Sequence, residues 1–549
     1  MLLGQSDFKL QVTKGVYIDK TDIIDELSEK IDTASGIVIN RPRRFGKTLM
    51  LSTLDYFFSD RYDSLSLFKD LKIGRSPNLC HINKYPVIRL SFKQISTFES
   101  ESILLEIKKL LASLYEERKE SFYPSLSSSE KAFYDGILAL KVSNEDFAKA
   151  LNFLASCYEK YRRKKPIILI DEYDGPIEKT FDSPFYDGAL SFLRSLYVAT
   201  FKDTTNFCFA LLTGVFSLAK GTLGSGLNNL PVDNALVKAL KKNYFGFDDG
   251  EMASLQKQFC LTPMEMKSIK ENYGGYLFAG ESVYNPWSVL NYLNSRQFGE
   301  YWSGSGSNET FVKVLGKTDF LEGKLFLSLM GEGEFMHLDL SSSYGTIYQS
   351  EDNIALYLVM AGYFSARQID IGEYFVYSPN RETKKAFSFE IAKRHKDTGE
   401  LLIAKKIKLA ILEGDEESLA HYLKDYVLSS LSYYDFGNER EYQIMVGTLL
   451  SVLFSDCLVK YEVIAGTGRC DIMVSPINER RFGFVIETKF HKDRLSSSRL
   501  TSSATSALGQ IKKHDYAQEL FRRNASPIYA YGLAFYKNNV AVRFEKLRD

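Results

Sequence analysis

The chain has 549 residues, of which 45% are hydrophobic and 25% charged, the composition of an ordinary globular protein. A single core rarely grows beyond about 250–300 residues, so two or three domains are expected. Lysine plus arginine and aspartate plus glutamate both number 69, which excludes a chain drawn to polyanions by its overall charge.

The six cysteines are widely spaced and form no C-x-x-C pair. This spacing argues against a zinc site or a disulfide framework and favours a reducing compartment. The first residues lack the basic start and apolar run of a signal peptide. No stretch reaches the roughly 18 uncharged apolar residues that a membrane span needs. We therefore expect a cytoplasmic protein with no membrane contact.

Through the first 220 residues, short apolar runs rich in β-branched residues alternate with helical patterns. Residues 36–40 read as a buried strand, followed by a loop and a helix over 48–58. Residues 103–117 carry apolar side chains at helical spacing, and 166–170 and 207–213 read as further buried strands. Strands interleaved with helices predict a mostly parallel sheet that is covered on both faces.

From about 245 to 400 the pattern is mixed, rich in aromatic residues and glycine, and carries no assignable chemistry. Residues 301–308 are typical of an exposed loop. The segment 401–434 has helical periodicity and leads into the last domain. We expect the middle region to be a mainly helical lid or connecting region.

The C-terminal part reads as a small α/β unit, with 17 basic against 12 acidic side chains between 439 and 549. This modest basic excess suits a domain that handles phosphate backbones, but many other domains carry as much. The expected elements are a helix over 439–454, strands over 458–464, 469–474 and 482–489, a long helix over 504–522, and strands over 528–535 and 540–544.

The loop after the first strand carries a phosphate-binding signature. Residues 41–48 read RPRRFGKT, which matches the end of G-x-x-x-x-G-K-[ST] with Arg41 where the first glycine should be. Gly46 would let backbone N–H groups approach phosphates, Lys47 would reach the β- and γ-phosphates, and Thr48 would bind Mg²⁺ at a helix N-terminus. A bare G-K-[ST] tripeptide is weak evidence, but here a buried strand precedes it and an apolar-faced helix follows it.

The second half of this predicted site is the run IILIDE at 167–172. Asp171 would lie at the carboxyl end of a strand, where ligands bind in α/β sheets, and hold Mg²⁺. Glu172 would polarise a water, and Thr213, at the end of the next strand, could sense the γ-phosphate. A buried strand ending in an acidic turn is the structural alternative. The residues expected to bind ATP are Arg44, Gly46, Lys47, Thr48, Asp171 and Thr213, with Thr48 and Asp171 on the metal.

Here the sequence resembles a known family, the AAA-ATPase-like proteins that carry a C-terminal PD-(D/E)XK nuclease domain. That family characteristically reads RPRRFGKTL, as residues 41–49 do. The arginine in place of the first loop glycine therefore looks like a family trait. The blocks DEYD at 171–174, LTG at 212–214, GLNN at 226–229 and YNPW at 284–287 also resemble the family's characteristic blocks. The resemblance spans nearly the whole chain and implies an ATP-binding fold and a nuclease fold, but no particular substrate.

The C-terminal unit contains the residue types that metal-dependent phosphodiester cleavage needs, namely carboxylates to bind a metal and a nearby cation. Glu487 and Lys489 are two apart on one predicted strand, so both face the same side. Antiparallel pairing would bring Asp471 alongside on the preceding strand. Asp471 and Glu487 would bind Mg²⁺, while Lys489 would orient or deprotonate the attacking water, or stabilise the transition state. An E-x-K pair alone is more often a surface pair, and only its neighbours favour the catalytic interpretation.

The resemblance implies two further site residues. Glu439 opens the preceding helix, where this nuclease group typically has an acidic residue, and the flanking Tyr-Gln favours it over Glu441. Gln510 lies in the following helix, where the group has a glutamine. Cys470 replaces the proline that names the motif, at a position that varies in the group and ligates nothing. The expected catalytic residues are Glu439, Asp471, Glu487, Lys489, Gln510 and, in the ATPase domain, Glu172.

The predicted fold class is α/β. It comprises a P-loop AAA-like domain with a mostly parallel sheet over 1–245, a mixed middle region over 246–400, and a restriction-endonuclease-like α/β domain over 401–549. The leading hypothesis is an ATP-binding protein whose Mg²⁺-dependent nuclease domain hydrolyses DNA under nucleotide control, with ATP and Mg²⁺ as cofactors and nucleic acid as partner. An oligomer is compatible with this hypothesis.

Two alternatives stay open at this point. One is a nucleotide-dependent binding switch whose nuclease-like domain binds nucleic acid or protein without cleavage. The other is an ATPase whose nuclease-like domain serves assembly. Intact Asp471, Glu487 and Lys489 favour the nuclease, since an inactive one would be expected to have lost one of them.

Overall fold

The computed structural model describes residues 2–95, 102–216, 230–302, 309–317, 329, 333–394, 400–430, 439–454, 457–476 and 482–548. The chain divides into two compact units. Met1–Thr318 and Phe335–Arg381 form the first, and Asp319–Glu334 and Glu382–Asp549 form the second. Most of the loop predicted over 301–308, and all of the GLNN block, lie outside the described residues.

A five-stranded sheet with the order β2-β3-β4-β1-β5 forms the centre of the first unit, and all of its pairings are parallel. Its strands are β1 (Ser35–Asn40), β2 (Val87–Ser91), β3 (Ile167–Asp171), β4 (Phe209–Gly214) and β5 (Val232–Asp233). Every residue of β3 and β4 is buried, as is typical of strands that have helices on both faces. The predicted parallel α/β architecture is therefore confirmed.

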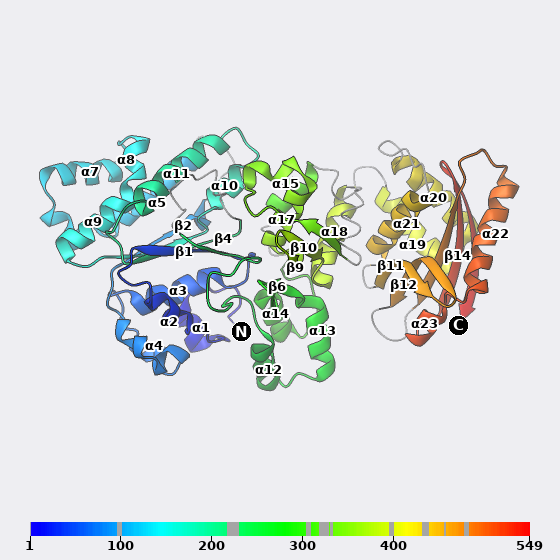
Figure 1. The fold of residues 1–549 in the computed structure, drawn as a ribbon, viewed down its shortest axis with the longest axis horizontal. Coiled ribbons are helices and arrows are strands. Elements are labelled where there is room, and N and C mark those ends of the chain that lie inside the picture. The colour runs from blue at the N-terminus through cyan, green and yellow to red at the C-terminus, as the bar shows by residue number, and fades with distance from the viewer. Residues whose placement is uncertain are drawn as a thin grey trace. The chain divides into compact units, whose positions relative to one another are not determined.

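Helices cover both faces of this sheet (Figure 1). One face carries α1 (Phe8–Lys14), α2 (Ile23–Ser28), α3 (Lys47–Phe58) and α4 (Leu65–Phe68), which share a hydrophobic core with β1, β3 and β4. The other face carries α5 (Ser102–Glu116), α7 (Ser128–Leu138), α8 (Asn144–Ala148), α9 (Ala150–Arg162) and α11 (Tyr186–Phe201). Two short helices, α6 (Lys119–Phe122) and α10 (Gly175–Thr180), follow α5 and β3 respectively.

The rest of the first unit mixes helices with two small antiparallel sheets. The helices are α12 (Asp249–Gln258), α13 (Pro263–Tyr273), α14 (Pro286–Ser295), α15 (Glu309–Gly316) and α17 (Glu351–Ala361). The sheets are the hairpin β6 (Tyr276–Phe278) with β7 (Glu281–Val283), and β8 (Glu334–His337), β10 (Glu373–Tyr377) and β9 (Ser365–Asp370) in that order. The expectation of a mainly helical region did not anticipate these strands, because strands of three to six residues show too few alternations to be distinguished by periodicity.

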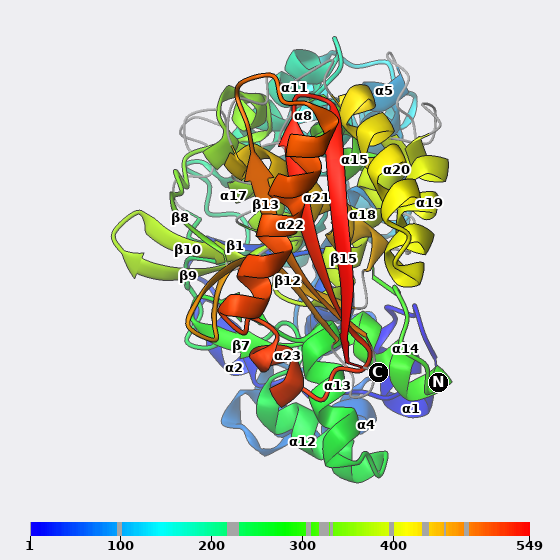
Figure 2. The same ribbon diagram turned by 90° about the vertical axis from the view of Figure 1, so that its right-hand side faces the viewer.

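The second unit contains a mixed sheet with the order β11-β12-β13-β14-β15, in which only β13 and β14 are parallel. The strands are β11 (Cys457–Ala465), β12 (Gly468–Pro476), β13 (Gly483–Phe490), β14 (Ile528–Tyr536) and β15 (Asn539–Arg548). One face packs against α19 (Glu400–Glu413), α20 (Glu416–Ser430) and α21 (Glu439–Leu453), which follow α18 (Arg381–Arg394). On the other face, α22 (Ser497–Lys513) lies along β13, β14 and β15 (Figure 2).

The single long helix predicted over 504–522 is wrong in both its start and its continuity. α22 begins earlier, within a serine-rich stretch, because Leu500 and Ala504 continue the buried apolar stripe of the helix. It ends at Lys513, and a separate helix, α23, spans Gln518–Arg522. Between them Asp515 has a φ of +52°, a left-handed conformation that interrupts a right-handed helix.

Candidate functional sites

The loop between β1 and α3 opens onto a cavity of about 540 Å³. α3 begins at Lys47, and Gly46 before it has a φ of +97°, which glycine adopts without strain. A Cβ on Gly46 would meet no atom within 4 Å, so the glycine is needed for its backbone conformation rather than for space. Gly46, Lys47 and Thr48 all line the cavity. The loop thus presents a helix N-terminus, an ammonium group and a hydroxyl to one cavity, an arrangement suited to a phosphate group.

The loop itself holds the Lys47 side chain. Lys47 is 7% exposed, and its Nζ donates to the backbone oxygens of Arg41 at 2.7 Å and Pro42 at 3.0 Å. Burial lowers the pKa of Lys47 to about 8, and the charges of Glu172 and Asp171 oppose this effect. A phosphate in the cavity would give this buried cation a full counter-charge, which two neutral carbonyl oxygens cannot.

The two acidic residues of this predicted site, Asp171 and Glu172, lie at the carboxyl end of the buried strand β3. Asp171 is fully buried, and its Oδ1 accepts a hydrogen bond from the hydroxyl of Thr213 at 2.8 Å. Its Oδ2 is buried without a hydrogen-bond partner in the described part of the chain. Because an unsatisfied buried carboxylate oxygen is costly, a divalent cation would fit there. Glu172 has a φ of +52° and lines the cavity, and burial, followed by the charge of Asp171, raises its pKa.

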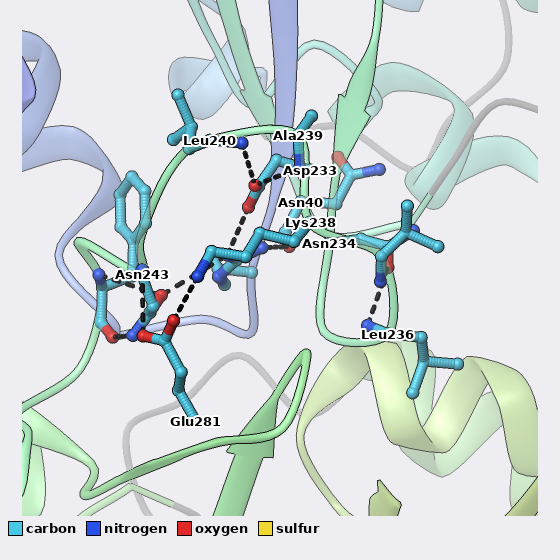
Figure 3. Close-up of polar contacts among 12 residues, drawn as sticks. Asn40, Asp233, Asn234, Leu236, Lys238, Ala239, Leu240, Asn243 and Glu281 are labelled. Atoms are coloured by element: carbon cyan, nitrogen blue, oxygen red, sulfur yellow. Dashed lines mark hydrogen bonds and ion pairs between the residues drawn. The ribbon is translucent and has the colours of Figure 1, made fainter. Parts of the chain in front are cut away.

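Arg41, which stands where the first loop glycine was expected, is a buried structural side chain. It is 2% exposed and forms an ion pair with Asp233, which is 1% exposed. Asp233 Oδ2 also accepts from the backbone N–H groups of Ala239 at 2.8 Å and Leu240 at 2.9 Å (Figure 3). The Arg41 guanidinium lies 5.0 Å from the ring centroid of Phe278 in β6. Arg41 therefore ties the phosphate loop to the segment after β5, a role that the sequence motif did not indicate.

Two tryptophans contact the arginines of the same loop. The Arg44 guanidinium lies 4.6 Å from the ring centroid of Trp287, and Arg44 also lines the cavity. Asn285 caps α14 by accepting from the Trp287 N–H at 3.0 Å, so the YNPW block orients the ring that Arg44 covers. The indole of Trp302 donates to the backbone oxygen of Arg43 at 3.0 Å.

The second aspartate of the DEYD block, Asp174, joins distant segments. It is 1% exposed and accepts from the backbone N–H groups of Val215 at 3.0 Å and Phe216 at 2.9 Å, just after β4. The Tyr344 hydroxyl donates to the same oxygen at 3.0 Å. Burial, followed by the charge of Glu178, raises the pKa of Asp174 to about 6. This residue was not predicted, although its place in a characteristic block was a signal.

In the second unit, two carboxylates lie where β12 and β13 diverge. The antiparallel pairing of these strands ends at Ile472↔Ile486, one residue short of Asp471. Asp471 Oδ2 instead accepts from the backbone N–H of Thr488 at 2.7 Å and from its hydroxyl at 2.8 Å. Thr488, the unpredicted middle residue of the E-x-K motif, thus holds Asp471 against β13.

Glu487 is the most buried acid of this group. It is 1% exposed, and its Oε1 lies 3.4 Å from Lys489 Nζ. Its Oε2 is buried and has no hydrogen-bond partner among the residues that the structure describes. Burial raises the pKa of Glu487 to about 7, and the charge of Asp471 adds to this effect. A buried carboxylate oxygen without a hydrogen-bond partner among the described residues, beside a second carboxylate, fits a divalent cation that keeps several water ligands, such as Mg²⁺.

The helix acid lies close to this group. Glu439 is the first residue of α21, and its Oε2 accepts from the backbone N–H of Phe490 at 3.1 Å. Its carboxylate therefore lies at the end of β13, one residue beyond Lys489. The side chain of the alternative, Glu441, lies outside the described residues.

Gln510 is less closely connected to the carboxylates. Its Nε2 donates to the hydroxyl of Tyr516 at 3.4 Å, and in the described ranges no hydrogen bond joins it to Asp471 or Glu487. Cys470 is fully buried, and its Sγ donates to the backbone oxygen of Ile472 at 3.2 Å. It packs in the core of the sheet face that carries α22.

Within the described residues, no group of three or more His, Cys, Asp or Glu side chains is arranged to hold a metal ion. Each candidate site therefore offers at most two acidic side chains, or one acid and a hydroxyl. Such a donor set leaves the remaining positions of an ion to water and substrate phosphate, as is usual for Mg²⁺.

Comparisons with known proteins agree with this architecture. Residues 3–223 match the family described as predicted AAA-ATPase, and residues 437–545 match the PD-(D/E)XK nuclease superfamily. An uncharacterized protein encoded in the vnfD 5′ region of Azotobacter chroococcum mcd 1 is 27% identical over 304 residues, which are 54% of this chain and 52% of that protein. The chain thus spans about half the length of this curated relative.

Across the described part of the chain, no helix is both long and apolar enough to cross a membrane. The first match contains strands β1 to β4 of the parallel sheet, and the second contains β11 to β14 and most of β15 in the mixed sheet. The chain therefore combines an N-terminal predicted AAA-ATPase-like domain with a C-terminal domain of the PD-(D/E)XK nuclease superfamily.

Proposed function

We propose that this protein binds ATP with Mg²⁺ in the first unit and hydrolyses DNA phosphodiester bonds in the second, under nucleotide control. The observation that carries the nuclease proposal is the group formed by Asp471, Thr488, Glu487 and Lys489. There the end of β13 supplies a buried carboxylate, one of whose oxygens has no partner among the described residues, and an amine, and β12 supplies a second carboxylate.

In the second unit, Asp471 and Glu487 would hold Mg²⁺, which when bound supplies a polarised phosphate and a water of lowered pKa. Lys489 would orient the attacking water or balance the charge that develops on the phosphate oxygens as the water oxygen bonds to phosphorus and the ester P–O bond breaks. Thr488 would keep Asp471 in place. Glu439 and Gln510 would orient the site from the flanking helices.

In the first unit, Lys47, Gly46 and Arg44 would contact the phosphates of ATP, and Thr48 and Asp171 would hold its Mg²⁺. Glu172 would polarise the attacking water. Thr213, whose hydroxyl is bonded to Asp171, would respond to the γ-phosphate through that carboxylate. We also retain 1–245, 246–400 and 401–549 as the proposed division into domains.

The test of the nuclease proposal is a cleavage assay of the full chain on single-stranded, linear duplex and supercoiled DNA, with Mg²⁺ or Mn²⁺, and with and without ATP. Lys489→Ala should lower the cleavage rate about 100- to 1000-fold while metal binding persists. Glu487→Ala should lose both DNA cleavage and metal binding in the second unit. Lys513→Ala, an exposed lysine in the last turn of α22, is the matched control and should retain cleavage. Full cleavage by Glu487→Ala would show that the carboxylates are wrongly assigned.

The second candidate is a nucleotide-dependent switch that binds nucleic acid or protein without cutting. It is favoured by Gln510, which is bonded to Tyr516 and, within the described residues, to neither Asp471 nor Glu487. Wild-type protein that binds DNA but leaves every substrate intact with either metal would favour this switch over the nuclease.

A further inference from the structure

Several of the side chains that line the cavity at the phosphate loop are cationic, and they lie in segments that follow strands of the parallel sheet. Two of them, Lys93 and Lys179, belong to no nucleotide-binding motif of the sequence. Lys93 lies two residues after β2, and Lys179 lies in α10, which follows β3. In a parallel sheet the carboxyl ends of all strands lie at one edge, so both lysines emerge at the same edge as the phosphate loop after β1. The cations lining the cavity on this side are Arg43, Arg44, Lys47, Lys93 and Lys179.

These five cations differ in the groups that they already contact. Arg43 forms an ion pair with Glu178 at 2.8 Å, Arg44 covers the Trp287 ring, and Lys47 donates to two backbone oxygens. For the ammonium groups of Lys93 and Lys179, neither a hydrogen bond nor an ion pair is found within the described residues.

Lys179 is half-buried at this position. Burial lowers its pKa, and the charge of Glu172, the strongest of the acids acting on it, only partly opposes this effect. A partly desolvated ammonium group without an ion-pair partner is costly, and an anionic group in the cavity would compensate it.

The part of the lining that comes from later in the chain carries no charge. From residue 244 onward the cavity is lined only by aromatic, aliphatic, glycine and threonine residues, namely Tyr244, Gly246, Phe247, Pro286, Trp287, Leu290 and Thr310. Lys20 also lines the cavity, but it forms an ion pair with Glu251 at 2.7 Å. Of the lysines that line the cavity, Lys93 and Lys179 are therefore the two whose ammonium groups have no partner among the described residues.

ATP and ADP differ by one such charge-bearing group, the γ-phosphate. The loop N–H groups bind the phosphates that both nucleotides share, and Lys47 reaches the β- and γ-phosphates, so the ammonium groups of Lys93 and Lys179 add positive charge beyond what ADP requires. We propose that Lys93 and Lys179 bind the γ-phosphate and make this site select ATP over ADP. This inference rests on the proposed ATP binding and adds the residues that distinguish the two nucleotides.

The position of Lys179 gives such selection a structural effect. Its neighbour Glu178 holds Arg43 of the phosphate loop, and Asp174, directly before α10, holds the end of β4 and the Tyr344 hydroxyl. A γ-phosphate bound by Lys179 thus acts on a helix that is tied to the phosphate loop, to the sheet and to the segment around Tyr344.

Calorimetric titration of the full chain with MgATP and with MgADP tests the inference. Lys179→Gln and Lys93→Gln should each weaken ATP binding about 10- to 100-fold, the usual effect of removing a hydrogen bond between charged groups, and should change ADP binding by less than about twofold. Lys179→Arg should preserve the preference for ATP. Lys109→Gln, an exposed lysine in α5, should affect neither nucleotide.

Equal weakening of ATP and ADP, or no weakening of either, would overturn the inference while leaving ATP binding by the loop intact. Wild-type protein that binds neither nucleotide would overturn the proposed ATP site and this inference with it. Thermal melting of each variant distinguishes a loss of the contact from a loss of the fold, and Lys93→Gln, which alters an exposed side chain, keeps the test decisive if Lys179→Gln is unstable.

Discussion

Replacing Glu487 by glutamine should stabilise the metal-free second unit, and by an amount that depends on pH. The pKa of Glu487 is raised from 4.5 to about 7 because the side chain is buried. A carboxyl group whose pKa is higher in the folded than in the unfolded state favours folding while protonated, and this contribution is lost as pH rises through about 4.5 to 7. At about 1.4 kcal/mol per pKa unit, the loss is about 1 kcal/mol at pH 5 and about 3 kcal/mol at pH 7.5. Glutamine carries no charge, so the variant should escape this loss.

Hydrogen exchange of β13 amides, measured on the full chain with a chelator present, reports this difference. Comparing variant and wild type at one pH cancels the intrinsic pH dependence of exchange. At pH 7.5, β13 amides that exchange through unfolding of the unit should exchange about a hundredfold more slowly in Glu487→Gln, and at pH 5 only a few-fold more slowly. Glu417→Gln, an exposed acid in α20, should show no pH-dependent difference. The same ratio at both pH values would refute the conclusion that the Glu487 carboxylate is held desolvated in the folded unit.

Three further substitutions test other features. Arg41→Gly, which restores the usual loop residue, should destabilise the first unit by about 3–5 kcal/mol because it leaves the buried Asp233 carboxylate without its cation, and a wild-type urea midpoint would contradict the structural role of Arg41. Thr488→Val should weaken metal-dependent cleavage about 10- to 100-fold by releasing Asp471, whereas Thr488→Ser should restore it, and equal rates in the two variants would exclude the hydroxyl contact as the cause. Glu172→Gln should retain ATP binding by calorimetry and slow hydrolysis at least about a hundredfold, so an unchanged hydrolysis rate would assign the base elsewhere.

The fold and the site residues could be predicted where an apolar run that forms a buried strand ends in the polar residues of a site. The run at 167–171 is apolar until its last residue, so both the buried strand β3 and the polar end at Asp171 follow from local sequence. β13 is similar, because Glu487 and Lys489 end an apolar run that must be covered on both faces. In both cases the residue of interest lies within a few positions of the pattern that reveals the strand.

The unpredicted features depend on residues that are distant in sequence. Arg41 reads as a departure from a motif until Asp233 appears beside it, 192 positions later. Asp174 and Tyr344 are 170 positions apart. The role of Thr488 could not be predicted, because its hydrogen bonds to the preceding strand depend on where the pairing of β12 and β13 stops. Periodicity and motifs describe neighbours along the chain, and they contain no information on contacts between residues that are far apart in sequence.

The contact of both tryptophans with the phosphate loop has a practical consequence. The chain contains only two tryptophans, and one lies against the Arg44 guanidinium while the other donates to the backbone oxygen of Arg43. Both indoles of the protein therefore contact this loop, each at one of two adjacent residues. Its ultraviolet emission is an intrinsic optical signal of that loop, and excitation at the red edge of the absorption band would follow the loop in the full chain without an attached dye.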